Sequence, residues 1–509
     1  GVLPSKLQPQ NPIKTTIVPS DVAVYLPPPV TTPAPFTSRD ERFKEPRNPF
    51  VEGVEKHGGL PISWPETLVK RAYEVMLDRF LRCKPVRKVV GKLSIEEAVV
   101  GVQGVDEIGS IDMTTSPGFG WKHLAPPGEK GKRWLFELEE TSSGNKLNSV
   151  HKELLKILQQ ENDMREQGCA PATVFTDCLK DARIKVEKVQ KKGCTRIFSL
   201  SPVQHTIACR QYTVEFVAAV MRYRITNNVC VGINMDSLEA TRLVKKHMKV
   251  SDRHLCGDYS AFGDTLDPQL VYYCFKIIAE WYKYYGDQSR AHELARMALG
   301  IETGQALHAA RDLVYRVFSG LPSGSPLTVI INSMVNSFYT LLSFEEITGL
   351  PLETYSEYVA EDNYGDDLWL TVKDDIIDKF NNVLLHENFK KHNIRYTDAL
   401  KTGSMREYCS LAEVSFLKRN FVRHPTRDAL YLAPLDWVSV EECAKWIHFC
   451  DNTPEATAVN ILAAQRLAFG HGPTKFKEFT ELLKVAARQA EVRVCGFFDW
   501  HALDAQTFE

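Results

Sequence analysis

Apolar residues recur along much of this chain with the spacing of an amphipathic helix. Over residues 64–81 and 147–160 they return every three or four positions, which predicts two helices with one buried face each. The run "DPQLVYYCFKIIAEWYKYYGD" predicts a further helix, with Asp267 as N-cap, Pro268 at the first helical position and Gly286 just past the end.

Two short segments between the helices predict strands. One is the run at residues 255–262, and the other is 359–372, where Gly365 marks a turn and the residues that follow it are compatible with an outgoing strand. From residue 438 to about 493 the spacing is helical once more, with a capping box expected at "SVEE", 439–442, and a new helix expected at 453–454. Helices around separate strands, followed by a helical C-terminal region, indicate an α+β fold.

The first fifty residues do not follow either pattern. They hold eleven of the 27 prolines, so this arm is extended and is either a linker or a strap lying on the rest of the protein; we favour the strap. A Gly/Pro-rich loop is expected at "TSPGFGW", residues 115–121.

Composition narrows the class of protein without naming it. With 509 residues and 44% hydrophobic content, the chain can bury a large core in two to four domains or subdomains. The net charge of −2 does not indicate nucleic-acid binding, so the distribution of charge along the chain must be considered segment by segment. The 12 cysteines form no CxxC pair, which favours a reducing compartment, and we find no leader and no apolar run of membrane-spanning length. Gly1 in place of Met indicates either release from a longer precursor or a trimmed chain.

Two adjacent carboxylates, Asp366 and Asp367, stand at the expected tip of a hairpin. Gly365 permits the tight turn, and "LWLTV" continues as a strand. Two unit charges about 4 Å apart repel by roughly 4 kcal/mol at an effective dielectric of about 20. Either water around an ordinary exposed turn or a bound cation must screen them.

A third carboxylate, Asp258, follows an apolar approach about 100 residues upstream. Carboxylates at the ends of separate strands are what a site for two metal ions needs, because one segment cannot surround two cations with oxygens. Between these acids, "SGSPLTVIIN" holds Ser323, Gly324, Thr328 and Asn332, with the last two on one helical face. A loop that caps a core helix explains the same residues equally well.

A basic run covers residues 180–196 of an otherwise balanced chain. Such a run is usually a solvated face, and the alternative is a channel for phosphates. It holds Lys180, Arg183, Lys185, Lys188, Lys191, Lys192 and Arg196 against only Asp181 and Glu187.

In this order, the segments resemble those of picornavirus-like RNA-dependent RNA polymerases over nearly the whole chain, and the proline arm with "DYSAFGD" resembles insect iflaviruses. "YGDD" at 364–367 is similar to the catalytic hairpin of that family, "DYSAF" from Asp258 to its first catalytic strand, and 323–332 to its ribose-sensing loop and helix. Four further segments match: the template-entry loop at Thr115, Ser116, Pro117 and Gly118, the NTP-channel fingertip at 180–196, the general-acid segment "DALK" ending at Lys401, and the primer grip "FLKR" with Lys418 and Arg419.

The resemblance implies a closed right hand whose palm is an antiparallel sheet with helices. Fingers are expected at 1–212 and 263–318, palm at 213–262 and 319–423, and a helical thumb at 424–509. It also implies template-directed nucleotidyl transfer. Two Mg²⁺ ions, for which Mn²⁺ could substitute, would be held by Asp258, Asp366 and Asp367. Lys180, Lys188 and Arg196 would bind the triphosphate, and Lys401 would protonate the pyrophosphate.

The sequence departs from the family pattern at two places near the expected catalytic carboxylates. Glu361 and Asp362 make the strand before the turn unusually acidic. Gly263 occupies the position where these polymerases usually carry a second aspartate, so we expect Asp264, anchored to Asn332 by an unusual backbone conformation at Gly263, to serve the ribose 2′-hydroxyl. The alternative is that Asp264 only caps the turn before the next helix.

Other functions remain open at this point. A reverse transcriptase shares the paired-aspartate hairpin but usually carries a bulky aromatic where this chain has Gly263, and a catalytically silent RNA-binding or capsid protein would leave the three acids unexplained. The expected partners are an RNA template and primer, NTPs, and a small viral protein primer with other viral replication proteins. The expected location is the host cytoplasm, at membrane-associated replication complexes.

Overall fold

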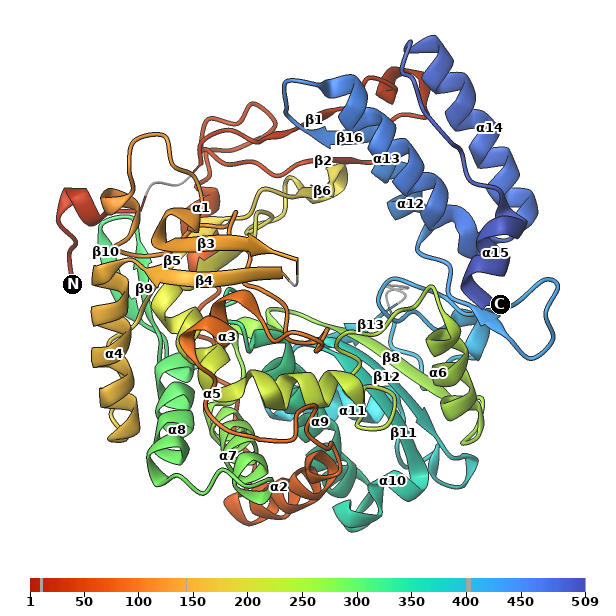
Figure 1. The fold of residues 1–509 in the computed structure, drawn as a ribbon. Coiled ribbons are helices and arrows are strands. Elements are labelled where there is room, and N and C mark those ends of the chain that lie inside the picture. The colour runs from red at the N-terminus through yellow and green to blue at the C-terminus, as the bar shows by residue number, and fades with distance from the viewer. Residues whose placement is uncertain (10–11, 143, 400–403, 509) are drawn as a thin grey trace.

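The computed structural model describes residues 1–9, 12–142, 144–399 and 404–508, which form a mixed helical and stranded fold. The ribbon encircles a central gap, with the N-terminal arm crossing on one side to meet the C-terminal helices (Figure 1). The helices are α1 (Pro49–Val54), α2 (Glu66–Leu81), α3 (Ile95–Val100), α4 (Lys152–Glu166), α5 (Val203–Arg222), α6 (Leu238–Met248), α7 (Pro268–Tyr284), α8 (Arg290–Gly304), α9 (Thr328–Thr348), α10 (Tyr355–Tyr358), α11 (Asn382–Lys391), α12 (Trp437–Lys445), α13 (Thr453–Leu467), α14 (Pro473–Gln489) and α15 (Trp500–Phe508).

A four-stranded antiparallel sheet lies beside the long apolar helix α9. Its order is β11 (Val359–Tyr364), β12 (Asp367–Val372), β8 (His254–Tyr259) and β13 (Tyr396–Asp398). One continuous core joins α2, α5, α7 and α9 to this sheet. One face of the sheet is therefore packed against a close-packed core.

A second four-stranded sheet, of mixed direction, carries the basic run. Its order is β10 (Leu313–Arg316), β9 (Leu307–Ala310), β5 (Val174–Leu179) and β7 (Ile197–Leu200), with β5 and β9 parallel. Two further pairs are β3 (Phe136–Thr141) with β4 (Gly144–Val150), and β14 (Val422–Arg423) with β15 (Tyr431–Leu432).

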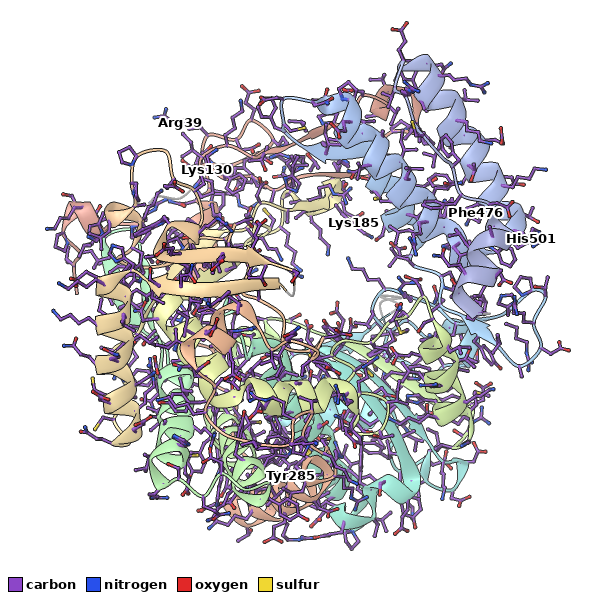
Figure 2. All side chains as sticks on the ribbon, viewed as in Figure 1. Arg39, Lys130, Lys185, Tyr285, Phe476 and His501 are labelled. Atoms are coloured by element: carbon purple, nitrogen blue, oxygen red, sulfur yellow. The ribbon has the colours of Figure 1, made fainter. Side chains whose placement is uncertain are left out.

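The proline-rich arm is a strap, as predicted. Its strand β1 (Ile17–Pro19) pairs with β16 (Trp446–His448), and β2 (Thr31–Pro33) pairs with β6 (Arg183–Lys185). Val22 and Leu26 of the arm are buried in the core formed by α12–α15. Lys185 lies at the rim of the central gap (Figure 2). The arm thus ties the basic run to the C-terminal helices.

Most predicted elements form, with two corrections at their ends. Residues 147–150 belong to β4, because they pair with β3, and the helix begins only at Lys152. The strand predicted to reach residue 262 ends at Tyr259, since Ala261 adopts φ +56° and starts a 3-10 turn, η6 (Phe262–Asp264). Asp267 and Pro268 do start α7 as predicted.

The C-terminal region also differs from its prediction in detail. The cap of α12 is Asp436, which accepts from the Ser439 amide, so the expected box at 439–442 lies inside the helix. Strand β16 interrupts the expected helical stretch because its partner is the distant arm, which local spacing does not reveal. No helix within the described residues is long and apolar enough to cross a membrane.

Candidate active site

The hairpin predicted at "YGDD" is present and joins β11 to β12. Tyr364 stands opposite Asp367, which leaves Gly365 and Asp366 as the two turn residues. Gly365 adopts φ +63° at the first turn position, where tight hairpin turns favour glycine. Asp366 is thereby presented at the tip, and Asp367 begins the outgoing strand.

Helix α9 holds this turn through two polar side chains in its apolar surface. Ser333 Oγ accepts from the Gly365 amide at 2.8 Å, and Asn336 Nδ2 donates to the Gly365 carbonyl at 3.0 Å. The hydroxyl of Tyr259 donates to Asn336 Oδ1 at 3.0 Å, which links the turn to β8. Sequence analysis missed these residues, although their polarity within an apolar helix was an available signal.

The third acid, Asp258, lies beside the hairpin at the end of β8. Gly257 stands opposite Leu368, so Asp258 and Asp367 occupy the next positions of the two paired strands. A Cβ on Gly257 would lie 1.8 Å from the Tyr396 ring, so only glycine permits this packing. The structure therefore brings together the three carboxylates that the sequence separated by about 100 residues.

Burial, assisted by neighbouring carboxylates, disfavours ionisation of the two hairpin acids, Asp366 and Asp367. Burial, with the charges of Asp366 and Asp258, raises the pKa of Asp367 to about 6, against a smaller lowering by Lys418. Burial also raises the pKa of Asp366, with a contribution from Asp258 and opposition from Arg196. Such a concentration of carboxylate oxygens fits hard divalent cations, which would relieve the repulsion.

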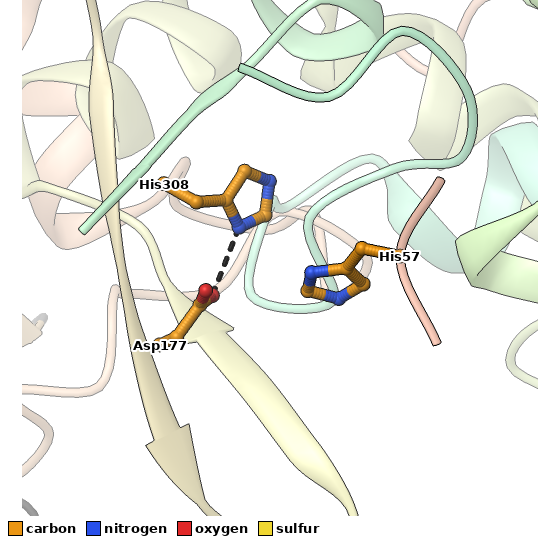
Figure 3. Close-up of side chains that lie close together, drawn as sticks. All are labelled: His57, Asp177 and His308. Carbon is orange, nitrogen blue, oxygen red and sulfur yellow. Dashed lines mark hydrogen bonds and ion pairs between the residues drawn. The ribbon is translucent and has the colours of Figure 1, made fainter. Parts of the chain in front are cut away.

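The three acids are not packed as tightly as a site for a single ion. Within the described ranges, one group of three His, Cys, Asp or Glu side chains has all its ligand atoms within 4.8 Å of one another, namely His57, Asp177 and His308 (Figure 3). The ligand atoms of Asp258, Asp366 and Asp367 do not all lie within this distance of one another.

The acidic pair before the hairpin belongs to the protein interior and not to this site. Asp362 binds Lys246 and His247 at 2.9 Å each; burial would raise its pKa, but these two partners hold it below its usual value. Glu361 accepts from Ser337 and from Asn363. The two side chains lie on opposite faces of β11, with Glu361 bonded to α9 and Asp362 bonded to α6.

The expected ribose loop packs against β7 of the second sheet. Ser323 Oγ accepts from the Ser199 amide at 3.0 Å, and the Gly324 amide donates to the Ser199 carbonyl at 3.0 Å. A Cβ on Gly324 would lie 2.3 Å from that carbonyl oxygen, so glycine is required. Thr328 starts α9 and donates to the Pro322 carbonyl.

The prediction for Gly263 and Asp264 is wrong in two respects. Gly263 does not have a positive φ, and a Cβ there would meet only Asn332 Nδ2, at an ordinary 3.6 Å. The Asp264 carboxylate lies 3.5 Å from His57 Nε2, and no hydrogen bond between it and Asn332 is found among the described residues. Because successive side chains diverge, Gly263 faces Asn332 while Asp264 points toward His57. Asn332 Oδ1 is buried without a hydrogen-bond partner in the part of the chain described.

Of the three residues expected to bind the triphosphate, Lys180 and Arg196 lie together in the basic run. The Lys180 amide donates to the Arg196 carbonyl, so both residues lie at the same end of the β5–β7 pair, and both side chains are exposed. Lys188 is exposed on the following 3-10 turn, η5 (Val186–Lys188). Lys56, which sequence analysis missed, joins this end by donating to the Gly193 carbonyl at 2.7 Å; burial lowers its pKa, Asp264 raises it, and Arg196 lowers it further.

The expected template-entry loop is folded by its own hydrogen bonds. Thr115 Oγ1 accepts from the buried Lys132 and donates to the Asp112 carbonyl, and Ser116 Oγ accepts from the Gly118 amide. Gly118 has φ +85°, with a Cβ position 2.5 Å from Pro202. Residues 5–9 of the arm and residues 116–118 line one cavity of about 630 Å³.

The expected primer-grip residues stand on a two-residue turn. Leu417 and Lys418 both have positive φ between the bridged Phe416 and Arg419. Lys418 is exposed near Asp367, whereas Arg419 binds Asp236 at 2.7 Å and the Ala433 carbonyl, which commits much of its guanidinium to the protein. The expected general acid, Lys401, lies outside the described residues.

Comparison with known proteins gives concordant matches. The family model described as "Viral RNA-dependent RNA polymerase" matches residues 20–500. The genome polyprotein of Deformed wing virus is 38% identical over 484 residues, covering 94% of this chain and 17% of the polyprotein. That of Rice tungro spherical virus (strain Vt6) is 30% identical over 506 residues, covering 96% of this chain and 14% of the polyprotein. The chain thus spans a small part of these relatives.

A solved structure shares the fold. The Sicinivirus 3Dpol RNA dependent RNA polymerase superposes with a TM-score of 0.82 at 19% sequence identity, covering 99% of this chain and 98% of that chain. At this identity the likeness shows the architecture alone, and it is that of a right-hand polymerase.

Proposed function

Because this chain belongs to the viral RNA-dependent RNA polymerase family, as the resemblance predicted, we propose that it copies an RNA template by adding ribonucleotides to a primer 3′ end. The observation that carries the proposal is the convergence of Asp258, Asp366 and Asp367 at the ends of two paired strands. A reverse transcriptase or a silent RNA-binding protein is the weaker alternative, since the family match covers residues 20–500.

We propose that these three carboxylates hold two Mg²⁺ ions, or Mn²⁺ in their place. When bound, the cations would lower the pKa of the primer hydroxyl and neutralise charge on the triphosphate. The protein's own contribution is orientation: Ser333 and Asn336 fix the hairpin turn and so hold Asp366 at its tip.

The cationic end of the β5–β7 pair is the proposed triphosphate site. Arg196 lies close enough to Asp366 to lower its pKa, so a phosphate bound between them would meet the fingertip on one side and the catalytic hairpin on the other. Lys180 and Lys56 extend this positive surface, and Lys188 is a further candidate. The exposed Lys418 is the proposed contact for primer phosphate.

Other parts of the proposal rest on the resemblance. Thr115, Ser116, Pro117 and Gly118 would guide the template, and Lys401 would donate a proton to the leaving pyrophosphate. The primer could be RNA or a small viral protein. We place the enzyme in the host cytoplasm, at membrane-associated replication complexes with other viral replication proteins.

Primer extension on an RNA template with ribonucleotides and Mg²⁺ tests the central claim. We expect Asp366→Asn, which keeps the shape and removes the charge, to lose extension at least a hundredfold while RNA affinity persists. Asp374→Asn is the matched control, because Asp374 is an exposed acid paired with Arg253 and remote from the site's paired strand ends. Equal extension by wild type and Asp366→Asn would reject the catalytic assignment, and preference for deoxyribonucleotides would favour the reverse transcriptase.

A further inference from the structure

Five polar side chains, three of them buried and two half-buried, form a network between the second sheet and the turn that follows β8. We call His57, Asp177, Ser199, His308 and Tyr315 the fingers network. Asp177 is at its centre: Ser199 Oγ lies 2.7 Å and His308 Nδ1 2.8 Å from Oδ1, and the Tyr315 hydroxyl lies 2.6 Å from Oδ2. His57 Nδ1 lies 2.7 Å from the same hydroxyl. Figure 3 shows the two histidines on the same side of Asp177.

The number of available protons determines which group donates in each hydrogen bond of the fingers network. An ionised carboxylate only accepts, so Ser199, His308 and Tyr315 must all donate to Asp177. Burial would raise the pKa of Asp177, but His308 and these hydroxyl donors hold it below its usual value, so it is ionised. Tyr315 has then used its only proton, and its oxygen must accept from His57 Nδ1. The network therefore dictates which nitrogen of His57 carries hydrogen.

The other nitrogen of His57, Nε2, faces the Asp264 carboxylate at 3.5 Å. A neutral ring with hydrogen on Nδ1 would direct a lone pair at this negative charge, whereas the protonated ring offers a donor. Burial lowers the pKa of His57, but Asp264 outweighs that effect, and the net pKa is raised. The charged groups around His57 are Asp264 on η6, Asp177 on β5 and the adjacent Lys56, with His308 and Tyr315 as the other titratable neighbours.

The hydrogen bonds described above account for His57, Asp177 and His308 better than a bound metal ion would. His57, Asp177 and His308 have ligand atoms within 4.8 Å of one another, as a metal site would. However, both Asp177 oxygens already accept from hydroxyl or ring donors, and a metal would have to displace the Tyr315 and His308 hydrogen bonds. The hydrogen-bond inventory is satisfied without a cation.

The resemblance places the ribose between two walls, Gly263 with Asn332 on one side and the Ser323 loop on the other, and both walls are attached to the fingers network. On one side, Asp264 belongs to η6, whose Gly263 faces Asn332 and accepts from the Leu321 amide at 2.8 Å. On the other side, Ser199 carries the hydrogen bonds to Ser323 and Gly324 of the loop before α9. Displacement of either end of the network would change the distance between these walls.

We propose that His57 is a positioning residue that, as an imidazolium, anchors Asp264 and thereby sets the ribose pocket formed by Gly263, Asn332 and the Ser323 loop. This inference rests on the proposed polymerase function. It replaces the direct ribose contact expected of Asp264 with an indirect role: the carboxylate holds the turn, and the turn presents its backbone to the nucleotide. Loss of the anchor should weaken use of ribonucleotides more than of deoxyribonucleotides, since only the former present a 2′-hydroxyl to the displaced wall.

Single-nucleotide incorporation with CTP and dCTP on one primer–template, by the full chain, tests the proposal. We expect His57→Ala and Asp264→Asn each to lower kcat/KM for CTP roughly tenfold, the factor of one hydrogen bond to a charged group, and to change dCTP use little. The double variant should be no worse than either single one, because both remove the same interaction. His57→Gln, which retains a donor near the Nε2 position, should recover part of the CTP efficiency.

Controls separate the proposal from misfolding and from a metal site. His501→Gln, an exposed histidine on α15, should match wild type (Figure 2). Equal losses for CTP and dCTP, or additive effects in the double variant, would overturn the positioning role. One equivalent of zinc in wild type that is missing from His57→Ala would also overturn it, in favour of a metal site. If wild type itself fails to extend a primer, it is the proposed function that fails.

Discussion

Restoring a side chain at Gly263 is the sharpest test of the ribose pocket. We consider Gly263→Asp, with Gly263→Ala and Gly263→Asn as controls for bulk and for charge. Gly263 has an ordinary φ, and a new Cβ would meet only Asn332 Nδ2 at 3.6 Å, so the backbone should tolerate all three. One further bond of about 1.5 Å would bring a carboxyl group beside that amide.

The magnitude follows from the hydrogen bonds that the new carboxylate can make. It would accept from Asn332 Nδ2 and offer a second oxygen to a ribose 2′-hydroxyl. A net hydrogen bond contributes about 1 kcal/mol, and one to a charged group contributes about 1.5–3 kcal/mol. We therefore expect Gly263→Asp to raise the preference for ribonucleotides by about five- to tenfold or more.

Competition between CTP and dCTP in single-nucleotide incorporation measures this preference. Gly263→Asn should give a smaller increase because its amide lacks the charge, and Gly263→Ala should give none. An unchanged CTP-to-dCTP ratio in Gly263→Asp, in a protein that still extends primers, would mean that Gly263 and Asn332 do not line the ribose pocket.

Two further predictions concern the fingertip and the core. Arg196→Ala should raise the apparent KM for NTP far more than it weakens RNA affinity at fixed salt, because the expected partner of Arg196 is the triphosphate; the opposite pattern would assign it to the RNA channel. Glu302→Gln should destabilise the fold by about 3–5 kcal/mol in denaturant unfolding, since it leaves buried Arg165 and His205 without their shared carboxylate. Burial opposes the ionisation of Glu302, but His205 and Arg165 hold its pKa at about 2, below the ordinary 4.5. This stability is therefore present above pH 4.5 and is lost as pH falls toward 2, where the difference between variant and wild type should shrink; a pH-independent difference would contradict the argument.

The sequence by itself determined the elements whose signals are local. The helix from Pro268 was marked by its N-cap and proline, and the hairpin at Gly365 by a glycine between two expected strand segments. The order of the motifs along the chain identified the family, because seven segments in one order are far more specific than "YGDD" alone. The arm's proline content favoured a strap, although not its strand partners.

Only the tertiary structure decided how distant residues face one another. Neither the burial of Glu361 and Asp362 nor the anchoring of Gly365 by Ser333 and Asn336 follows from sequence spacing, because the partners lie on other elements. Asp264 shows the limit most clearly. Asp264 stands only one position after Gly263, so the sequence suggested that it could replace the aspartate usual at that position. In a tight turn, however, neighbouring side chains point apart. Asp264 is therefore directed to His57, more than 200 residues earlier in the chain. Direction depends on backbone dihedrals and packing, which the order of residues alone does not fix.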